Sequence, residues 1–577
     1  MSQARYVASG DVQLAVRQWG DPRRPAIMLV HGYPDSSHVW DATAEQLAAE
    51  FHVIVYDVRG AGQSSAPHPV ADYDLDHLVA DAAAVADACS PDRPVHLVGH
   101  DWGSIQSWEA VTTERMKGRI ASYTSISGPS LDHAGYWILK RLKSHAPADK
   151  LQLAAQALHS WYIGMFHLPV AAPMSWKMGL DKLWPKLLAQ IEGVEADPNP
   201  TQQQDGERGI NLYRANVIKR VLRPRERYAD VPVQLVVPLR DHFVMPELLD
   251  DLPQWAPQLW RSDIDAGHWL PVSHPQIVAE KIAAFVRFVE GAPETPALKR
   301  ARVRGARRSQ SGKLVVVTGA GSGIGRETAL AYAEAGADTV CVDLDRAAAE
   351  RTAELACLLD TYSVAYAVDV GDAQAMESLA SEIERTLGAP DVVINNAGIG
   401  MSGPVLETST ADWDKILRVN LWGVIHGSRL FARQMVSAGK RGHIVNVSSG
   451  LAFFPTRLTP AYNTTKAAVQ MLSECLRAEL AGQGIGVSAI YPGVVNTNIV
   501  STARMLGGSE VETGKQRARA ERLYRLRNLK PEAVAAAILS AVEHNRAEVR
   551  VGTEVHVIRW LSRLAPGLGR RLARLDV

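Results

Sequence analysis

Short apolar runs rich in β-branched residues alternate along this chain with alanine-rich stretches of helical character, and the alternation starts twice. In the first half the apolar runs are AIMLV (26–30), HVIVYDV (52–58), VHLVG (95–99) and VQLVV (233–237). In the second half they are KLVVVTG (313–319), DTVCVDLD (338–345), DVVINNAG (391–398), HIVNVSS (443–449) and GVSAIYPG (486–493). Alternation of this kind predicts a parallel sheet covered by helices. We therefore expect two α/β domains, since 577 residues are too many for one ordinary core.

A basic segment separates the two sets. Residues 291–312, GAPETPALKRARVRGARRSQSG, are rich in Pro, Gly and Arg and show no hydrophobic periodicity, which is typical of a linker. We place the first domain at 1–290, a solvated linker at 291–311 and the second domain at 312–577. Short amphipathic and aromatic segments interrupt the strands of the first domain at about 130–223. This insertion predicts a helical cap over the strand ends, where open α/β sheets bind ligands.

The composition argues against several other classes of protein. Lys plus Arg and Asp plus Glu both number 62, so no global field favours a nucleic-acid partner. The four cysteines form no CxxC pair, which argues against a disulfide framework and a zinc site, and we expect no metal. No apolar stretch resembles a signal peptide or approaches the roughly 20 residues that span a bilayer. We expect a cytoplasmic protein that does not cross a membrane.

The pentapeptide GHDWG (99–103) has the form G-x-nucleophile-x-G and lies between the β-like VHLV and the helix-like SIQSWEAV. A strained strand-to-helix turn of this kind exposes its central side chain, here Asp101, at the top of a sheet. An aspartate before a helix can also serve as an N-cap, but the two glycines favour the first interpretation. A carboxylate nucleophile attacks an alkyl carbon and becomes an ester. The target is then an sp³ carbon with a leaving group, and breaking the ester requires water and a base.

Residues for that second step follow in the order nucleophile, acid, histidine that hydrolases with this turn use. Asp241 comes just after an apolar strand, and His268 lies farther on in DAGHWLP. His242 and His274 are competing histidines. His242, however, adjoins the acid in sequence and is poorly placed to receive its hydrogen bond, so we expect His268 to be the base, oriented by Asp241.

The segment LVHGYPDSSHVW (29–40) follows the first strong strand and carries an HG motif. This motif predicts an oxyanion hole formed by the backbone N–H groups of Tyr33 and Trp102. With these features, residues 1–290 resemble the epoxide hydrolases of the α/β-hydrolase fold. The resemblance implies that Tyr162 in WYIGMFHLP and Tyr213 in NLYRAN hold the epoxide oxygen and protonate it, giving a vicinal diol without a cofactor. Haloalkane dehalogenases share the aspartate, the acid, the base and often the tryptophan, and remain the alternative.

The segment VVVTGAGSGIGRETAL (315–330) runs from a strand through glycines into a helix. Gly319, Gly323 and Gly325 let the backbone approach a pyrophosphate, which the free N–H groups of the helix N-terminus stabilise. A glycine string alone is weak support. Its position at the start of a new strand–helix–strand pattern makes it a predicted dinucleotide site.

The type of dinucleotide depends on the end of the next strand. Asp343 lies there, 18 residues after Gly325. An acid at this place hydrogen-bonds ribose hydroxyls and repels a 2′-phosphate, which favours NAD over NADP. Arg326 and Arg346 keep NADP open, because either arginine could pair with a phosphate.

Four further motifs follow in order: NNAG (395–398), NVSSG (446–450), YNTTK (462–466) and YPGVVNT (491–497). Together with TGxxxGxG they resemble the short-chain dehydrogenase/reductase family over nearly all of 312–577, with a Rossmann-type doubly wound parallel sheet. The resemblance implies a catalytic tetrad of Asn420, Ser449, Tyr462 and Lys466. Tyr462 would exchange a proton with an alcohol or carbonyl oxygen, and Lys466, four residues on and therefore on the same helix face, would lower the pKa of the phenol. Besides Tyr462 and Lys466, the expected cofactor-binding residues are Gly319, Ser322, Gly323, Ile324, Gly325, Asp343, Asp369, Val370, Asn396, Ala397, Gly398, Pro492, Gly493 and Thr497.

The whole chain resembles actinobacterial fusions of these two families, which implies epoxide hydrolysis and NAD(P)-dependent oxidoreduction in one protein. Aromatic residues of the cap favour a small hydrophobic substrate, with a lipid-derived epoxide as one candidate; they are Trp161, Phe166, Trp176 and Trp184. The family resemblance also implies a homo-oligomer formed through the second domain. A cofactor-binding module that oligomerises without turnover is the alternative for that domain.

Two segments near the C-terminus carry further expectations. Residues 503–528 correspond to the region that covers the substrate in the dehydrogenase family. Residues 555–577 mix leucines and a tryptophan with five arginines, so they could rest on a membrane surface. Packing at a subunit interface or on their own domain is the favoured interpretation, because Pro566 and Gly567 divide the amphipathic pattern into short pieces.

Overall fold

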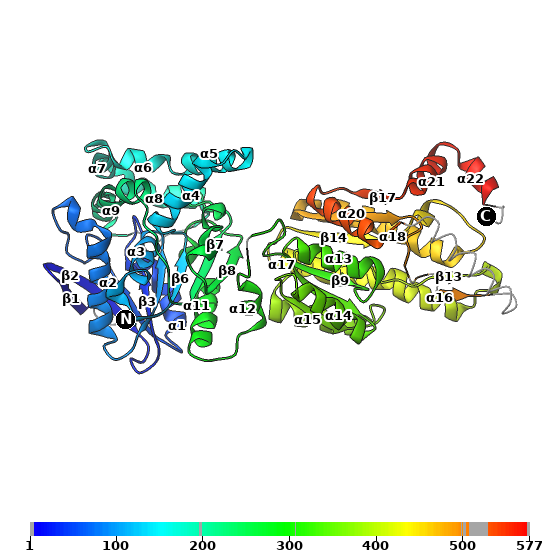
Figure 1. Cartoon of the computed structure of the whole chain (residues 1–577), viewed down its shortest axis with the longest axis horizontal. Coiled ribbons are helices and arrows are strands. Elements are labelled where there is room, and N and C mark those ends of the chain that lie inside the picture. Colours follow the sequence, from blue (N-terminus) through cyan, green and yellow to red (C-terminus); the bar gives the residue numbers. More distant parts are fainter. Residues whose placement is uncertain are drawn as a thin grey trace. The chain divides into compact units, whose positions relative to one another are not determined.

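The computed structural model describes residues 5–194, 199–305, 307–497, 499, 503–506 and 529–573. Its contacts divide the chain into two units, Met1–Ala306 and Arg307–Val577, and each is built around its own sheet (Figure 1). Both are α/β folds, as the alternating pattern predicts. Within the described ranges, no helix combines the length and the apolar character needed to cross a membrane.

An eight-stranded sheet forms the centre of unit 1, in the order β1-β2-β4-β3-β5-β6-β7-β8. β1 and β4 pair antiparallel with β2, and the remaining neighbours are parallel. The strands are β1 Arg5–Ser9, β2 Val12–Trp19, β3 Ala26–Val30, β4 His52–Tyr56, β5 Val95–His100, β6 Ile120–Ile126, β7 Val233–Pro238 and β8 Leu259–Ile264. β3, β4, β5 and β7 are buried at every position, because helices cover both faces of the sheet.

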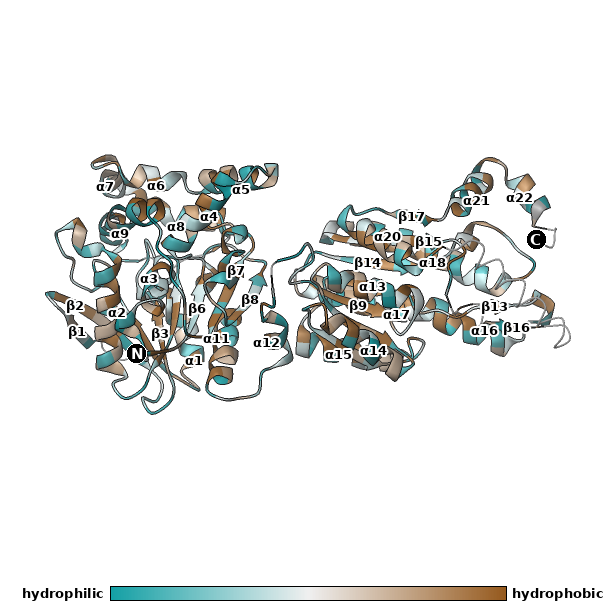
Figure 2. Ribbon diagram, viewed as in Figure 1, coloured by the Kyte–Doolittle hydropathy of each residue, from teal (hydrophilic) through white to brown (hydrophobic). Residues whose placement is uncertain are grey.

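Successive residues of β3 enter different cores. Ile27 and Leu29 belong to the core beneath α1 (Asp41–Leu47) and α11 (Pro275–Val289). Met28 and Val30 belong to the core beneath α2 (Leu75–Cys89) and α3 (Trp102–Val111). The period of two places alternate side chains on opposite faces of the sheet, and Figure 2 shows the strands as predominantly hydrophobic.

Between β6 and β7 the described residues, 127–194 and 199–232, form helices joined by short loops and no strand. The helices are α4 Leu131–Lys143, α5 Pro147–His159, α6 Trp161–Phe166, α7 Ala171–Ser175, a π-helical turn at Trp176–Leu180, α8 Asp181–Ile191 and α9 Gln202–Leu222. These helices lie together over one edge of the sheet (Figure 1), and we call them the cap. The phenol of Tyr33 ties cap to core, because it accepts a hydrogen bond from Trp176 Nε1 at 2.9 Å and donates to the Gly206 carbonyl oxygen at 3.1 Å.

Part of the expected linker is structured. Pro296–Ala301 forms helix α12, and Leu298 is buried against Trp260 and Phe285 of unit 1. Val303 donates a backbone hydrogen bond to the Leu259 carbonyl oxygen at 2.8 Å. The expectation of a wholly solvated tether at 291–311 is therefore wrong for 296–303, because one leucine of the basic run finds an apolar site.

Unit 2 contains a parallel seven-stranded sheet in the order β11-β10-β9-β12-β14-β15-β17. The strands are β9 Leu314–Thr318, β10 Asp338–Asp343, β11 Ser363–Ala367, β12 Val392–Asn395, β14 Gly442–Val447, β15 Ile485–Pro492 and β17 Glu548–Val551. The order reverses between β9 and β12, and a crevice at such a switch point is where doubly wound sheets bind dinucleotides. The Rossmann-type sheet expected from the motifs is confirmed.

Helices cover both faces of this second sheet. One apolar core includes residues of α13 (Gly323–Glu334), α14 (Arg346–Cys357) and α20 (Pro531–Glu543). The other includes residues of α15 (Ala373–Leu387), α17 (Gly423–Ser437) and α18 (Pro460–Leu480). The C-terminal segment forms α21 (Thr553–Leu564) and α22 (Pro566–Leu572). Of the segment 503–528 expected to cover the substrate, 507–528 lies outside the described residues.

Candidate functional site

Asp101 stands on a strained turn between β5 and α3. Its backbone has φ 51° and ψ −121°, a conformation that costs free energy for any residue with a Cβ. Both glycines of the motif are required by close approaches. A Cβ on Gly99 would lie 2.4 Å from the Gly103 carbonyl oxygen, and one on Gly103 would lie 2.1 Å from the Val30 carbonyl oxygen. The turn thus matches the expected nucleophile elbow.

His268 and Asp241 meet Asp101 at this turn. His268 Nε2 lies 3.6 Å from Asp101 Oδ2, and His268 Nδ1 lies 2.9 Å from Asp241 Oδ2. The backbone N–H groups of Phe243 and Val244 donate to Asp241 Oδ1 at 2.8 and 3.0 Å. The acid is therefore held in place on the far side of the imidazole, as an orienting carboxylate must be.

The competing histidines lie elsewhere. His242 is exposed and its carbonyl oxygen is near His159 Nδ1, at 2.7 Å. His274 precedes α11, with Nδ1 at 2.9 Å from the hydroxyl of Ser273. Neither imidazole forms a hydrogen bond or ion pair with the side chain of Asp101 or Asp241, whereas His268 contacts both, so the geometry favours His268.

The charges of this group are strongly coupled. Burial disfavours the imidazolium of His268, but the carboxylates of Asp241 and Asp101 outweigh burial and raise the pKa of His268 well above its usual value. Burial also opposes ionisation of Asp241, and the imidazolium together with two backbone N–H groups still lowers the pKa of that carboxyl. The site therefore stabilises one positive charge between two negative charges.

The early loop supplies a hydrogen-bond donor to the carboxylate. The backbone N–H of Tyr33 donates to Asp101 Oδ1 at 2.7 Å. A Cβ on the preceding Gly32 would lie 2.4 Å from the same oxygen, so the loop can approach only with glycine there. Trp102 follows Asp101 at the start of α3, and its indole is buried against the Tyr213 ring, with the ring centroids 4.9 Å apart.

Tyr162 of α6 and Tyr213 of α9 lie in one aromatic cluster beside Asp101. Their ring centroids are 6.0 Å apart, and the Tyr213 ring is 4.9 Å from Trp102 and 5.4 Å from Tyr33. Phe243 bridges from Tyr162 to His268, at 5.5 and 4.9 Å. Burial, followed by nearby ionisable groups including Asp101, raises the pKa of both phenols. Both therefore remain protonated donors at neutral pH.

Three further ionisable groups belong to the site although the sequence did not single them out. Asp35, two residues after Tyr33, accepts a hydrogen bond from Trp269 Nε1 at 2.8 Å, and burial raises its pKa to about 7. His100 Nε2 lies 2.9 Å from the His268 carbonyl oxygen, and burial lowers the pKa of His100 to about 4. Glu192 of the cap packs its carboxylate against Gly267, and burial raises its pKa.

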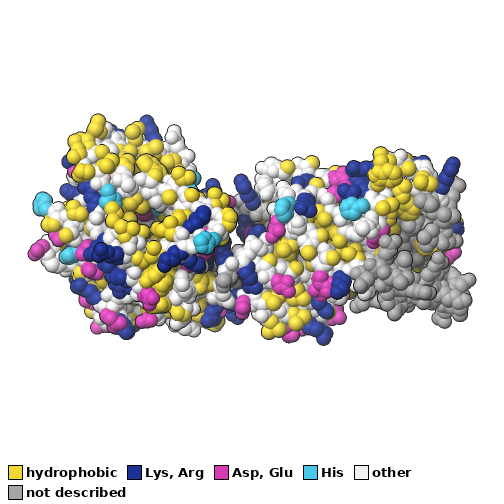
Figure 3. Space-filling view, turned by 45° about the horizontal axis from the view of Figure 1, so that its top comes forward, with side chains coloured by type: hydrophobic (Ala, Val, Ile, Leu, Met, Phe, Trp, Pro, Cys, Tyr) yellow, Lys and Arg dark blue, Asp and Glu magenta, His cyan; other side chains and the backbone are white. Residues whose placement is uncertain are grey.

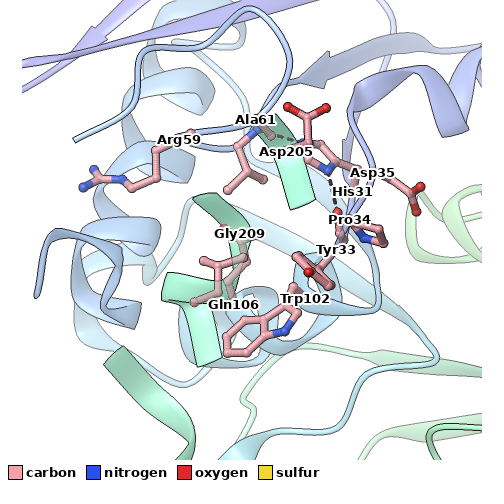
Figure 4. Close-up of a pocket in the computed structure, with 14 residues that line it drawn as sticks. His31, Tyr33, Pro34, Asp35, Arg59, Ala61, Trp102, Gln106, Asp205 and Gly209 are labelled. Carbon is pink, nitrogen blue, oxygen red and sulfur yellow. Dashed lines mark hydrogen bonds between the residues drawn. The ribbon is translucent and has the colours of Figure 1, made fainter. Parts of the chain in front are cut away.

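A small cavity adjoins the early loop (Figure 4). Tyr33 and Trp102 contribute to its lining, as do Asp35, Gln106 and Asp205. Burial raises the pKa of Asp205 to about 6, and neither polar atom of the Gln106 amide has a hydrogen-bond partner among the described residues. Asp101 and His268 do not line this cavity, so it lies beside the expected site of chemistry rather than over it.

In unit 2, the glycine loop joins β9 to α13. Gly319 has φ 67° and Gly323 has φ 54°, in the region that favours glycine. A Cβ on Gly325 would lie 2.0 Å from the Gly319 carbonyl oxygen. Ser322 and Ile324 complete the loop at the N-terminus of α13, where the free backbone N–H groups of a helix can bind an anion.

Asp343, at the end of β10, is bound to this loop. Its Oδ2 accepts a hydrogen bond from Gly321 N–H at 2.8 Å. Arg346 is paired with Glu350 at 2.8 Å, and Arg326 donates to the Gly321 carbonyl oxygen and to Thr352 Oγ1. Both arginines are thus paired within the protein. Asp343 occupies the place at the end of β10 where the adenosine ribose of a dinucleotide binds in folds of this kind.

The four residues of the expected tetrad converge on α18 and its surroundings. Lys466 Nζ is 5.7 Å from the Tyr462 ring centroid and donates to the Val447 carbonyl oxygen at 3.0 Å. Asn420 lies in a π-helical turn, Arg418–Trp422, and exchanges hydrogen bonds with the backbone of Ile399 at 2.8 and 3.0 Å. Burial lowers the pKa of Lys466 to about 8.

The choice between two neighbouring serines also has a structural counterpart. Ser448 donates its hydroxyl to the Lys466 carbonyl oxygen at 2.8 Å. Ser449 lies at the N-terminus of a 3₁₀ turn, where Oγ accepts from Leu451 N–H at 3.2 Å. The hydroxyl of Ser448 is thus committed to the backbone of α18, and Ser449 remains the favoured tetrad member.

The other expected cofactor residues surround the same crevice. Asp369 pairs with Arg418 at 3.0 Å, and Val370 packs beneath Gly423. Thr497 is the nearest neighbour of a Cβ built on Gly323, at 3.1 Å. After β12, Asn396 Nδ2 donates to the Thr318 carbonyl oxygen at 3.1 Å and Ala397 N–H donates to Thr318 Oγ1 at 3.1 Å. Gly398 follows and lies beside Asn420 and Lys466. Pro492 ends β15, and the next residue, Gly493, lies beside Val555 and Glu554. This cradle of glycines, acid and buried lysine fits a nicotinamide dinucleotide.

Comparisons with known proteins identify both units. The alpha/beta hydrolase fold family matches residues 25–275, and the short chain dehydrogenase family matches residues 313–505. The probable oxidoreductase EphD of Mycobacterium tuberculosis is 40% identical over 584 residues, which cover 100% of this chain and 99% of that protein. The putative oxidoreductase SadH of the same organism is 32% identical over 271 residues, or 47% of this chain and 96% of that protein. A crystal structure of a short chain dehydrogenase/reductase from Burkholderia phymatum in complex with NAD is 28% identical, covers 47% of this chain and 98% of its own, and has a TM-score of 0.42.

Proposed function

This chain belongs to the family of EphD, in which an α/β-hydrolase-fold domain precedes a short-chain dehydrogenase domain, and from that premise we propose a bifunctional enzyme. Unit 1 hydrolyses an epoxide to a vicinal diol through an ester at Asp101. Unit 2 oxidises an alcohol or reduces a carbonyl compound with a nicotinamide cofactor. The observation that carries the first activity is the convergence of Asp101, His268 and Asp241 with two buried phenols.

The first step forms the ester. An oxygen of Asp101 bonds to a ring carbon, the carbon–oxygen bond of the ring breaks, and the released oxygen takes a proton from Tyr162 or Tyr213. Because burial keeps both phenols protonated, they can stabilise the negative charge as it develops on the epoxide oxygen. A dry aromatic surrounding strengthens that interaction.

The second step breaks the ester. His268 first passes its proton to the phenolate left by the first step. Water then attacks the carboxyl carbon of Asp101 while His268 Nε2 accepts one of the protons of that water. The ester carbon–oxygen bond breaks, the departing diol oxygen takes the proton that remains on the added oxygen, and Asp101 is restored as a carboxylate. The diol therefore carries one oxygen from the epoxide and the other from Asp101. Ester formation itself prepares the base, because it neutralises one of the two carboxylates that hold the pKa of His268 high. His268 thus gives up its proton and becomes a base only after the nucleophile has reacted.

Trapping the ester tests this mechanism. We expect a His268→Gln variant to accumulate an alkylated peptide containing Asp101, read by mass spectrometry after brief exposure to a panel of epoxides. In ¹⁸O water, the first turnover of the native protein should give an unlabelled diol and leave the label in Asp101. A first diol that already carries the solvent label would refute the ester route.

Dehalogenation is the second candidate for unit 1. The observation that favours it is the buried indole of Trp102 directly after Asp101, since an indole N–H can hold a halide. The two phenols favour the epoxide instead, because an alkoxide oxygen needs a proton donor and a halide does not. Release of halide from a haloalkane, with no consumption of epoxides, would decide for dehalogenation.

In unit 2, the bound cofactor would accept or donate a hydride. The glycine loop and the N-terminus of α13 would hold its pyrophosphate, and Asp343 would bind the adenosine ribose, which supports NAD rather than NADP. Tyr462 would pass a proton to or from the substrate oxygen, and the positive charge of Lys466 would favour its phenolate. A Tyr462→Phe variant should bind cofactor and lose turnover; equal inactivity of both proteins would support a binding module.

The two activities have a natural order, because a diol is an alcohol that a dehydrogenase can oxidise. Tethering raises the local concentration of the product near the second site. Addition of an epoxide and NAD to the intact protein should therefore produce reduced cofactor, followed by its absorbance. Diol formation without any reduced cofactor would contradict the sequence of reactions and leave both separate activities intact.

A further inference from the structure

The outer helices of the cap expose large apolar side chains. Met178 is 81% exposed, Leu158 74%, Trp161 68% and Val170 66%. Figure 3 shows hydrophobic side chains gathered over this part of unit 1. We call the following residues the cap face: Leu151, Leu158, Trp161, Leu168, Val170, Met174, Met178, Leu183 and Ile191. Large apolar side chains gathered on an exposed face indicate an interaction site.

The sequence of the cap face is that of a segment apolar on all sides. Residues 161–176, WYIGMFHLPVAAPMSW, contain no carboxylate, lysine or arginine. Their inner face is already accounted for, since Phe166 and Trp176 are buried and Tyr162 is half-buried in the aromatic cluster. Helices that are hydrophobic all round are normally buried on all sides. The outward-facing side chains of α6 and α7, such as Trp161 and Met174, are instead exposed.

Basic residues accompany the cap face. Lys182 and Lys186 of α8 are exposed next to Leu183. Lys177, which precedes Met178, is already paired with Glu207 at 2.6 Å, so the positive charge of this surface comes from the two lysines of α8. An apolar surface with interspersed lysines is complementary to an anionic lipid surface, where each lysine contributes about 1 kcal/mol. A symmetric dimer through this face would instead place these lysines against the apolar surface of the second copy, where burial of an unpaired ammonium group is costly.

We propose that the cap face docks unit 1 on an anionic lipid surface, from which lipophilic epoxides reach Asp101. The proposal rests on the proposed function for its substrate and on the exposed residues for its surface. Trp161 and Tyr162 are neighbours on α6, one outside and one facing the aromatic cluster. One helix, about 10 Å across, therefore separates the lipid phase from the reacting phenols, and an apolar substrate avoids a path through water.

Flotation of the full chain with lipid vesicles tests the docking without any catalytic readout. We expect binding to vesicles that contain phosphatidylglycerol, weaker binding to pure phosphatidylcholine, and weakening by salt. The double variant Met178→Glu/Leu183→Glu should lose affinity by about tenfold or more, since it adds two negative charges and removes apolar contact. The control Leu358→Glu/Leu406→Glu introduces the same two charges at highly exposed leucines of unit 2, 79% and 98% exposed against 81% for Met178 and 54% for Leu183, and should bind as the native protein does.

Several outcomes would overturn the proposal. These are absence of vesicle binding by the native chain, equal binding by both double variants, or a native dimer that the Met178→Glu/Leu183→Glu variant dissociates, which would make the cap face a subunit interface. Loss of binding in Arg563→Glu/Arg570→Glu, with the cap variants unaffected, would assign the contact to α21 and α22. Turnover of a short water-soluble epoxide, measured in parallel, should be unchanged in every variant. Its absence in all of them would refute the proposed function and leave the docking result standing.

Discussion

Lys466 offers a quantitative test of unit 2, because the structure buries its ammonium group without a carboxylate in hydrogen-bond contact. The side chain is 4% exposed, and Nζ donates to the Val447 carbonyl oxygen at 3.0 Å. Burial lowers the pKa of Lys466 from 10.5 to about 8. The native fold therefore holds this proton less tightly than the unfolded chain does, and keeping the charge costs stability at neutral pH.

The size of that cost follows from the pKa. One pKa step corresponds to about 1.4 kcal/mol, so the penalty at pH 7 is about 3 kcal/mol. Above about pH 10.5 Lys466 is neutral in both the folded and the unfolded chain, so its burial costs no charge there. As the pH falls to about 8, the unfolded chain takes up the proton first, and the folded state loses stability over that range. Lys466→Met removes the charge and forfeits one hydrogen bond worth about 1 kcal/mol. We expect unit 2 of the variant to be about 2 kcal/mol more stable at pH 7, and to lose this advantage between pH 8 and 10.5.

Urea unfolding combined with pulse proteolysis measures this effect in the full chain, because the surviving fragment of residues 307–577 reports unit 2 separately. The measurement is made without cofactor. Lys415→Met, at an exposed lysine of α16 (Thr410–Leu417), serves as the control and should change stability by less than about 0.5 kcal/mol. A Lys466→Met protein that is less stable than the native one at pH 7, or a stability difference independent of pH, would refute the reasoning.

Three further outcomes follow from the sites. Tyr213→Phe should slow ester formation by about 10²–10³-fold while leaving ester hydrolysis unchanged, as read by single-turnover mass spectrometry; Tyr136→Phe, whose ring lies against Trp255, is the control, and equal rates in the two variants would count against a proton-donating role. Asp101→Asn removes one of the two carboxylates that raise the pKa of His268, so an NMR titration should give a lower pKa than in the native protein, and an unchanged value would contradict the coupling. Asp343→Ser should raise the preference for NADP over NAD by about tenfold or more in kcat/KM, because it removes the charge that repels a 2′-phosphate; an unaltered ratio would show that Asp343 does not read the ribose.

The two α/β folds and the centres of both sites could be predicted from sequence because their signals are local. The elbow at Asp101 and the loop at Gly319 each require glycines at fixed spacing, and the backbone angles at both places explain why. His268 was found by chain order rather than by any local pattern. Its position beside Asp101 depends on β7 pairing with β6 and β8 pairing with β7, so that the carboxyl ends of these strands lie along the same edge of the sheet as that of β5.

The missed residues lack such signals. Glu192 directly follows α8 in a polar stretch of sequence. Its proximity to Gly267 depends on how the cap packs on the core. Asp35 looks like an ordinary loop carboxylate until burial beside Trp269 raises its pKa. Leu298 sits in a basic run that reads as solvated, and only Trp260 and Phe285 explain why it is buried.

The cap shows a different limit of sequence analysis. Trp161 and Trp176 look equivalent in a segment that is apolar almost throughout, and hydrophobic periodicity cannot tell two faces apart when both are apolar. The structure separates them completely, with Trp161 68% exposed and Trp176 1% exposed. The proposed docking surface depends on this difference in exposure. Composition alone would have assigned both tryptophans to the core.

The two sites treat a buried positive charge in opposite ways, and the difference suits their proposed chemistries. In unit 1 the imidazolium of His268 lies between two carboxylates, so its charge is compensated until Asp101 reacts and releases it. In unit 2 the ammonium of Lys466 donates to the Val447 carbonyl oxygen and forms no ion pair with a carboxylate of the described residues, and it lies 5.7 Å from the Tyr462 ring centroid. A base that must change charge once per turnover needs a partner whose own charge is removed and restored in the same turnover. A lysine that must favour a phenolate throughout the reaction is more effective without a competing anion, and the lower stability of unit 2 at neutral pH is the consequence.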